Sequence, residues 1–232
     1  MTELKDKVAY ITGGSKGIGY GVAKTLLAKG MKVAITSRSL EAAQKAAQTL
    51  CSDASRVLAL QSDVVSLASE KAAVERTKEH FGAVDVLVAN AGVGHFGPID
   101  TLTEQEWKST LDTNLTGVFN TVKAGIEALK TSEGYIITIA SLAGANFFEG
   151  GAAYNASKFG LVGFSQAIML DLRKYGIKVT TIMPGSVATE FADHTPTDAD
   201  AWKIQPEDIG QLVADLLSMH SRTLPSKVEV RP

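Results

Sequence analysis

Short apolar runs rich in β-branched residues alternate along the chain with longer stretches in which apolar residues recur every three or four positions. The short runs have the length and composition of β-strands, and the longer stretches have the spacing of helices that bury one face. Apolar strands that alternate with helices are typical of a parallel sheet covered on both faces. We therefore predict strands at residues 8–12, 32–36, 56–60, 84–88, 135–139, 178–182 and 227–230.

Helical candidates fill the spaces between these strands, and the longest of them are 104–130 and 152–175. No linker, low-complexity tract or internal repeat divides the chain. We therefore expect residues 1–232 to form a single α/β domain. Residues 192–201 have the least regular pattern and are predicted to form a mobile surface loop.

Composition predicts a soluble globular protein. The 232 residues, of which 45% are hydrophobic, suffice to bury roughly 70% of the unfolded surface. The formal net charge of −2 argues against general attraction to nucleic acid or to an anionic membrane. The single cysteine, Cys51, cannot form an internal disulfide, the N-terminal residues are polar, and no apolar stretch approaches the ~18 residues of a membrane span. We expect a cytoplasmic protein whose partner is a small molecule.

The glycine-rich segment 12–19, Thr-Gly-Gly-Ser-Lys-Gly-Ile-Gly, follows the first predicted strand. Glycines permit a sharp turn and bring backbone N–H groups close to a phosphate, and the helix that begins near Gly17 directs its positive end at that anion. The spacing, T-G-x-x-x-G-x-G, gives a longer turn than the common G-x-G-x-x-G. The residues expected to contact a dinucleotide here are Gly13, Ser15, Lys16, Gly17, Ile18 and Gly19.

Two other interpretations of this segment compete with dinucleotide binding. The first is a glycine-rich strand-to-helix turn that binds nothing. The second is the nucleophile elbow of hydrolases, since residues 13–17 also satisfy G-x-S-x-G. An elbow needs an oxyanion-hole loop from an earlier strand, and only 12 residues precede Gly13. His194 and His220 also lack an evident orienting carboxylate, so the hydrolase interpretation is disfavoured.

The end of the second predicted strand indicates which dinucleotide is bound. For NAD, an Asp or Glu is expected about 20 residues on, where it accepts a hydrogen bond from the ribose 2′-hydroxyl. Here residues 36–39 read Thr-Ser-Arg-Ser, and no carboxylate comes before Glu41. Arg38 can instead make a forked contact with a 2′-phosphate, with Ser37 as a further donor and Lys16 as a second positive charge. Either cation taken alone could simply be solvated, but together they favour NADP(H).

Residues 154–158, Tyr-Asn-Ala-Ser-Lys, open one of the long helical candidates and place Tyr154 and Lys158 on one helical face. A neighbouring ammonium is expected to lower the pKa of the Tyr154 phenol from its reference value of ~10. Tyr154 is then a general acid for reducing a carbonyl or a base for oxidising an alcohol. The alternative is a core-facing aromatic residue, because this spacing of tyrosine and lysine is common by chance.

Two further polar residues strengthen the catalytic interpretation. Ser141 directly follows the fifth predicted strand, at the carboxyl edge where open parallel sheets bind ligands, and its hydroxyl is placed to hold the substrate oxygen. Asn114 lies inside the first long helical candidate, where a polar amide is unfavourable unless it forms a hydrogen bond. We expect it to bond a water that leads protons to Lys158.

These motifs together resemble the short-chain dehydrogenase/reductase family in its single-domain form of about 250 residues. The resemblance extends from Lys7 to Thr189 and includes the glycine turn. Its remaining cofactor motifs are Asp63-Val64 after the third strand, Asn90-Ala91-Gly92 after the fourth, and Pro184-Gly185-Ser186-Val187-Ala188-Thr189. Asn114, Ser141, Tyr154 and Lys158 match the family's catalytic tetrad in order and spacing.

The resemblance implies a doubly wound Rossmann fold, a three-layer sandwich around a seven-stranded parallel sheet in the order 3-2-1-4-5-6-7. It implies that Tyr154 protonates a carbonyl oxygen, that Lys158 binds the nicotinamide ribose and that Ser141 orients the carbonyl, with Asn114 holding a relay water. A homotetramer or homodimer, formed through the two long helices, is implied in the same way. Outside the glycine turn, the implied cofactor-binding residues are Ser37, Arg38, Asp63, Val64, Asn90, Ala91, Gly92, Tyr154, Lys158, Pro184, Gly185, Val187 and Thr189.

The leading interpretation is an NADPH-dependent reductase of a ketone or aldehyde, with a 3-oxoacyl thioester as one candidate substrate. An NAD-dependent alcohol dehydrogenase and a non-catalytic dinucleotide sensor are the alternatives. The four histidines, at positions 80, 95, 194 and 220, lack ligand-like spacing, so no metal site is expected. His95, Phe96, Phe147 and Phe148 either line the substrate pocket or are ordinary packing residues.

Overall fold

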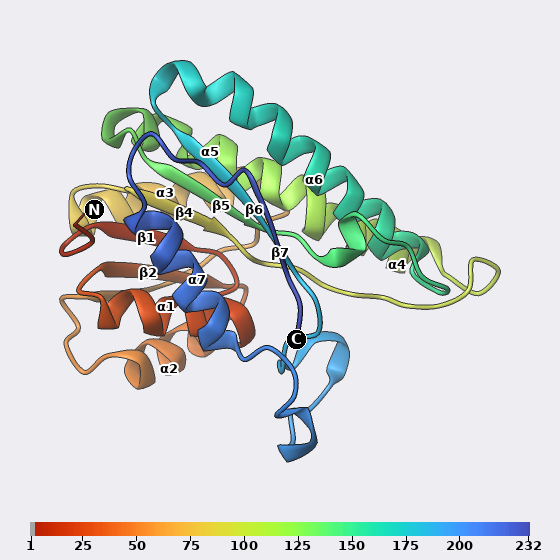
Figure 1. The fold of residues 1–232 in the computed structure, drawn as a ribbon. Coiled ribbons are helices and arrows are strands. Elements are labelled where there is room, and N and C mark those ends of the chain that lie inside the picture. Colours follow the sequence, from red (N-terminus) through yellow and green to blue (C-terminus); the bar gives the residue numbers. More distant parts are fainter. Residues whose placement is uncertain (1–2) are drawn as a thin grey trace.

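The computed structural model describes residues 3–232, which form three layers with a parallel sheet in the middle (Figure 1). Neighbouring strands pair in parallel throughout, in the order β3-β2-β1-β4-β5-β6-β7. The predicted fold class and strand order are therefore confirmed. The strands are β1 (Val8–Ile11), β2 (Lys32–Ser37), β3 (Val57–Gln61), β4 (Val86–Ala89), β5 (Tyr135–Ile139), β6 (Lys178–Pro184) and β7 (Lys227–Val230).

Helices cover both faces of this sheet. Helices α1, α2 and α7 pack on one face, and α3, α5 and α6 pack on the other, with α4 directly before α5 (Figure 1). Their bounds are α1 (Gly17–Ala28), α2 (Leu40–Leu50), α3 (Leu67–Phe81), α4 (Glu104–Leu111), α5 (Gly117–Ser132), α6 (Ala152–Leu172) and α7 (Pro206–Ser218).

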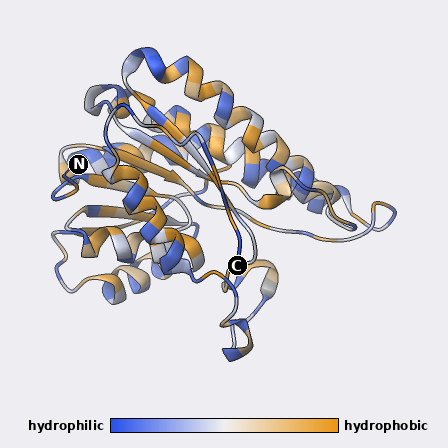
Figure 2. Ribbon diagram, in the orientation of Figure 1, coloured by the Kyte–Doolittle hydropathy of each residue, from blue (hydrophilic) through white to orange (hydrophobic). Residues whose placement is uncertain are grey.

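The central strands contribute apolar side chains to both layers, which explains why they are mostly apolar. In β1, Ala9 and Ile11 belong to the core shared with α1 and α7, whereas Tyr10 belongs to the core shared with α3, α5 and α6. In β5, Ile137 and Ile136 divide between the two cores in the same way. The hydrophobic colour of the strands in the middle layer follows from this double burial (Figure 2).

The helix predicted over 104–130 is present, but it contains a π-helical turn. Helix α4 ends at Leu111, a π-helical turn spans Asp112–Thr116, and α5 begins at Gly117. Within the π turn, the buried Asn114 side chain bonds the backbone of Val93, in the segment after β4. The spacing of apolar residues does not predict this π turn, because the helical segments on both sides keep their amphipathic spacing.

The segment predicted as a surface loop, 192–201, is irregular as expected, but it contains short 3₁₀ turns at Phe191–Asp193 and Asp198–Asp200. Asp200 is buried, so part of this segment is anchored to the body of the protein. Over residues 3–232 no helix combines the length and the apolarity needed to cross a membrane.

Candidate active site

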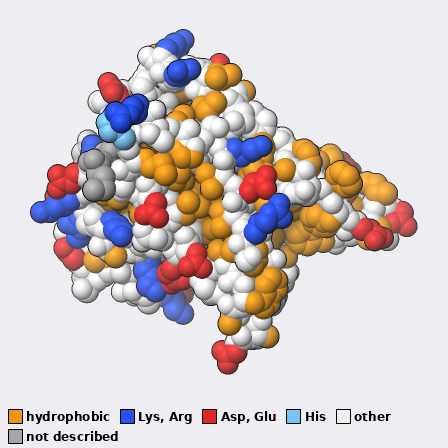
Figure 3. Space-filling model, in the orientation of Figure 1, with side chains coloured by type: hydrophobic (Ala, Val, Ile, Leu, Met, Phe, Trp, Pro, Cys, Tyr) orange, Lys and Arg blue, Asp and Glu red, His pale blue; other side chains and the backbone are white. Residues whose placement is uncertain are grey.

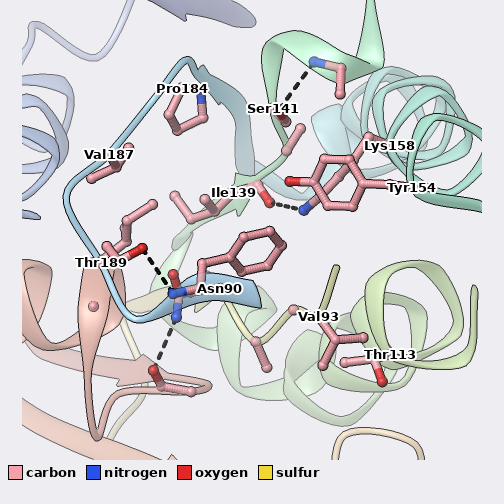
Figure 4. A pocket seen from close by; sticks show the side chains of 18 of the residues that line it. Asn90, Val93, Thr113, Ile139, Ser141, Tyr154, Lys158, Pro184, Val187 and Thr189 are labelled. Carbon is pink, nitrogen blue, oxygen red and sulfur yellow. Dashed lines mark hydrogen bonds between the residues drawn. The ribbon is translucent and has the colours of Figure 1, made fainter. Parts of the chain in front are cut away.

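A cavity of about 980 Å³ lies beyond the carboxyl ends of the central strands, between the glycine turn and the start of α6. Open α/β sheets bind ligands at this edge, where the strand order reverses. Every residue predicted for cofactor binding or catalysis lines the cavity, except Gly19 and Asn114. Figure 4 shows Asn90, Ser141, Tyr154, Lys158 and Thr189 around it, contributed by segments far apart in the sequence.

Three glycines of the turn are required by its geometry. Gly13 and Gly17 have φ angles of +63° and +55°, in the region that side chains other than glycine rarely adopt. A Cβ on Gly19 would lie 2.5 Å from both Asn90 Nδ2 and Gly13 O. Gly19 therefore supports the turn from beneath. Lys16 precedes α1 without a side-chain cap, and the first turn of α1 has no acidic residue, so this helix end suits an anion.

Asn90 fastens the turn to the sheet. Its Nδ2 donates to the carbonyl oxygens of Thr12 (2.9 Å) and Gly13 (3.1 Å). In return, the Thr12 hydroxyl accepts from the backbone N–H groups of Asn90 (3.0 Å) and Ala91 (3.1 Å). These bonds hold the ends of β1 and β4 in register and fix the floor of the cavity.

The segment after β6 forms the side of the cavity that faces the glycine turn. Gly185 N donates to Val230 O (2.8 Å), and Val187 pairs with Ile204. Thr189 is buried, and a Cβ on Gly17 would lie 3.3 Å from Thr189 Cγ2. The glycine turn and this segment thus form two sides of one narrow groove.

Two cations lie at the end of the cavity nearest β2. Arg38 directly follows β2 and Lys16 lies in the glycine turn; both side chains are exposed and both line the cavity. In the part of the chain that the structure describes, neither side chain forms an ion pair. Asp63 lines the same end, where its Oδ1 accepts from Val65 N (3.1 Å). The local chemistry suits a ligand with a phosphate.

Ser141, Tyr154 and Lys158 meet at the other end. Ser141 follows β5, and its Oγ accepts from Ala143 N (3.1 Å). Tyr154 and Lys158 are one turn apart on α6, and their polar ends point to the same side of the cavity (Figure 4). The Lys158 Nζ lies 5.6 Å from the Tyr154 ring centroid and donates to Ile139 O (3.0 Å).

Burial controls the ionisation of this pair. It raises the pKa of Tyr154 above its usual value, and the Ser141 hydroxyl offsets only part of this effect. It lowers the pKa of Lys158 to about 8. The predicted lowering of the Tyr154 pKa by Lys158 is therefore not observed: desolvation of the phenolate raises this pKa, and the group that lowers it is Ser141. A phenol with a raised pKa is protonated at neutral pH and is ready to donate.

Asn114 lies outside the cavity wall. Its Oδ1 accepts from Val93 N (2.8 Å), and its Nδ2 donates to Val93 O (2.9 Å) and to Ser157 Oγ (3.0 Å). Both N–H groups of the amide are used within the protein, so the side chain joins the segment after β4 to α6. That Asn114 holds a relay water remains a prediction.

Comparison with known proteins agrees with this arrangement. The family model for short chain dehydrogenases matches residues 7–200. The chain belongs to the short-chain dehydrogenase family. An uncharacterized oxidoreductase of Staphylococcus saprophyticus is 34% identical over the whole of both chains.

Solved structures of family members superpose closely. A short chain dehydrogenase from Burkholderia cenocepacia, in complex with NADP, is 32% identical with a TM-score of 0.89, over 99% of this chain and 98% of the other. The 3-ketoacyl-(acyl-carrier-protein) reductase of Brucella melitensis, complexed with NADH, is 28% identical with a TM-score of 0.90, over 98% of each chain.

The aromatic residues that line the cavity of this short-chain dehydrogenase were only partly predicted. Phe96, Phe147 and Phe148 line the cavity, whereas His95 does not. Phe191 also lines it, and its ring centroid lies 5.7 Å from that of Tyr154. Phe191 falls next to the segment predicted as a loop, where no periodic pattern marks a residue as buried or as functional. Only the contact in three dimensions identifies it.

Asp200 anchors the segment that carries Phe191. Its carboxylate accepts from Thr197 N (2.9 Å) and pairs with His194 Nε2 (2.8 Å) and Lys203 Nζ (2.5 Å). The bond from Lys203, followed by those from Thr197 and His194, holds the pKa of Asp200 well below its usual range. The ionised Asp200 therefore contributes its full stabilisation of the folded protein above the ordinary carboxyl pKa of ~3.9. This contribution is lost as the pH falls below that value and Asp200 takes up a proton.

Replacing Asp200 with Asn is expected to loosen residues 190–205 at pH 7, because the ion pair with Lys203 is lost. We expect amide hydrogen exchange in this segment to accelerate about tenfold. Asp198→Asn, on the exposed side of the same turn, is the matched control and should leave exchange unchanged. Equal exchange rates in the wild type and the Asp200 variant would show that Asp200 does not anchor the segment.

Proposed function

We propose that this protein is an NADPH-dependent reductase that converts a ketone or aldehyde to an alcohol. The observation that carries the proposal is that the Ser141 and Tyr154 hydroxyls and the Lys158 amine lie in the same cavity as the glycine turn. A glycine turn suited to a dinucleotide at one end and a half-buried proton donor at the other suit hydride transfer coupled to proton transfer.

The residues present fit a dinucleotide. A side chain at Gly13 would meet Ala91, and one at Gly17 would meet Thr189, so the turn leaves its backbone N–H groups open to a ligand. The uncapped start of α1 suits the pyrophosphate. When bound, the nicotinamide supplies the hydride that adds to the carbonyl carbon. Lys158 is placed to hold the ribose next to that ring, and Asn90 keeps the turn in position.

The protein's own chemistry is then the handling of one proton. Ser141 holds the carbonyl oxygen, and Tyr154 donates its phenolic proton to that oxygen as the carbonyl is reduced. The raised pKa of Tyr154 keeps this proton in place at neutral pH until transfer. The positive charge of Lys158, present below about pH 8, stabilises the phenolate that remains. Proximity and proton transfer supply the rate, with no covalent intermediate.

The choice of NADPH over NADH rests on Lys16 and Arg38, which have no acidic partner in the described part of the chain and line the cavity next to β2. Replacing Arg38 with Ala is expected to raise the Kd for NADPH about tenfold, because a charge-assisted contact with the 2′-phosphate is lost. The Kd for NADH, which lacks that phosphate, should change less than about threefold. Fluorescence titration with each reduced cofactor measures both constants.

Arg76→Ala, an exposed arginine on α3, serves as the matched control for this titration. A wild-type preference for NADH would contradict the assignment of Arg38 and favour the alternative of an NAD-dependent alcohol dehydrogenase.

The reaction itself is tested with a panel of ketones and aldehydes that includes a 3-oxoacyl thioester, a substrate class raised by the name of the Brucella relative. Loss of NADPH absorbance identifies turnover. Failure to oxidise NADPH with any carbonyl compound would overturn the proposal and favour a non-catalytic dinucleotide sensor. We also propose, from family membership, that the protein forms a homodimer or homotetramer.

A further inference from the structure

Two phenylalanine rings, Phe96 and Phe191, contact the ring of Tyr154, and a third, Phe148, contacts Phe96. The Phe96 centroid lies 5.3 Å from Tyr154 in an edge arrangement, and the Phe191 centroid lies 5.7 Å away. Phe96 also contacts Phe191 (6.3 Å) and Phe148 (5.9 Å). These spacings are those of attractive aromatic pairs. We call Phe96, Phe148 and Phe191 the aromatic wall.

The wall is built from three segments that meet only in the folded protein. Phe96 follows β4, Phe148 follows β5 and Phe191 follows β6. These segments also carry Asn90, Ser141 and the Pro184–Thr189 run. The aromatic wall therefore lies beside the reacting end of the cavity.

Two glycines make room for the rings. A Cβ on Gly94 would lie 2.6 Å from Phe191 Cε1 and 2.9 Å from Phe96 Cζ. A Cβ on Gly151 would lie 2.8 Å from Phe148 Cε2. The backbone at these two positions is thus in contact with ring edges, so the aromatic wall is a packed structure rather than a chance gathering of surface side chains.

The wall is nevertheless open on its cavity side. Phe96 is 48% exposed, Phe148 is 47% exposed and Phe191 is 36% exposed, although each ring contacts another. The segments after β4 and β5 project beyond α4, and the segment after β6 projects separately below the sheet (Figure 1); hydrophobic side chains lie on both projections (Figure 3). Exposed apolar surface beside a proton donor is surface that a bound substrate covers.

Charge at this end disfavours an anionic substrate. Apart from Lys16, Arg38 and Lys158, the lysines and arginines that line the cavity are Lys108 and Lys203. Each already has an acidic partner, because Lys108 pairs with Glu104 and Lys203 pairs with Asp200. His194 is bonded to Asp200 as well. Apart from Lys158, which the proposed mechanism uses, a carboxylate or phosphate on the substrate would find no cation without an acidic partner at this end, among the residues that the structure describes.

We propose that the carbonyl substrate is an uncharged compound with an aromatic ring near the carbonyl group, and that Phe96, Phe148 and Phe191 determine this specificity. The inference rests on the proposed function and names its substrate class. An aromatic ring gains edge and face contacts from the wall that a saturated ring of the same size does not gain.

The experiment compares substrates matched in carbonyl reactivity. In phenylacetone and cyclohexylacetone a methylene group separates the ring from the ketone, so the two carbonyls react alike without enzyme. We expect kcat/KM with NADPH to favour phenylacetone about 3- to 10-fold, through a lower KM. A second pair, methyl 4-acetylbenzoate and 4-acetylbenzoate, differs in charge at a distance from the ketone. The neutral ester should be preferred at least about tenfold.

Leucine variants connect the preference to the wall. Phe191→Leu and Phe148→Leu should each reduce the phenyl-over-cyclohexyl ratio to below about twofold by raising the KM for phenylacetone. Phe148 contacts Phe96 rather than Tyr154, so its variant tests the wall without touching the proton donor. Tyr175→Leu is the control, since its ring is 38% exposed and lies before β6, at the opposite edge of the sheet. Its ratio should equal that of the wild type.

The outcomes separate the inference from the function on which it rests. Turnover of 2-butanone and cyclohexylacetone without a preference for phenylacetone would overturn the inference and leave the proposed function intact. A phenyl preference that persists in both leucine variants, or a preference for 4-acetylbenzoate or acetoacetyl-CoA, would overturn it as well. Absence of turnover with every carbonyl compound would overturn the proposed function and the inference together.

Discussion

Replacing Tyr154 with Phe is expected to lower kcat/KM for carbonyl reduction by about 10²- to 10⁴-fold, the range that a positioned general acid contributes. The phenylalanine ring keeps the contacts with Phe96 and Phe191 and loses only the hydroxyl that donates the proton. The Kd for NADPH should therefore stay within about twofold of the wild-type value. Steady-state kinetics and fluorescence titration on the same preparation measure the two effects.

Tyr175→Phe is the matched control for this prediction, because it removes a phenolic hydroxyl at the opposite edge of the sheet. It should retain wild-type kinetics. If the Tyr154 variant reduces carbonyls at the wild-type rate, Tyr154 is not the proton donor.

Replacing Lys158 with Met is expected to remove activity and to stabilise the protein. Lys158 is buried, and burial lowers its pKa from 10.5 to about 8. At pH 7 the folded protein therefore holds a charged amine away from water, whereas the unfolded chain leaves the same amine hydrated, and this difference destabilises the folded state. That shift corresponds to about 3 kcal/mol. Methionine has a similar shape and no charge, but it leaves the Ile139 carbonyl without its bond. We therefore expect a gain of about 2 kcal/mol and a decrease in kcat/KM of at least about 10²-fold.

The stability gained by replacing Lys158 with Met should depend on pH. Between about pH 8 and pH 10.5 the unfolded chain keeps the Lys158 proton and the folded protein releases it, so the stability of the wild type rises with pH relative to the variant. The advantage of the Met variant should be complete below about pH 8 and should shrink above it. Urea unfolding at pH 7 and pH 9.5, at fixed protein concentration, measures both differences.

Lys45→Met, at an exposed position on α2, is the control and should alter stability by less than about 0.5 kcal/mol at either pH. If the Lys158 variant is less stable than the wild type at pH 7, burial of the charge does not cost the protein stability. A residue that is unfavourable for folding and placed next to a phenol is typical of a site selected for chemistry.

The fold could be predicted from the sequence because its signals are local and repeated. Strands buried on both faces are apolar at most positions, and the chain shows this in β1 and β5, where neighbouring residues enter different cores. The glycine turn could be predicted as well, because Gly13 and Gly17 have positive φ angles, which glycine adopts far more readily than other residues. Ser141, Tyr154 and Lys158 were found because each stands at a fixed place relative to a strand or helix.

Other features of the site depend on contacts between distant segments. The π turn around Asn114 accompanies bonds to Val93, which periodicity cannot reveal. The aromatic contact of Phe191 with Tyr154 arises where the segment after β6 meets the start of α6.

The sequence by itself determined the strand order, the position of the glycine turn and which residues line the cavity at the ends of the central strands, because these follow from local pattern and from the family resemblance. The tertiary structure alone decided the direction of the Tyr154 pKa shift, the role of Asn114 as a brace and the composition of the aromatic wall. Desolvation and ring contacts depend on what surrounds a side chain in space, and a one-dimensional pattern does not contain that information.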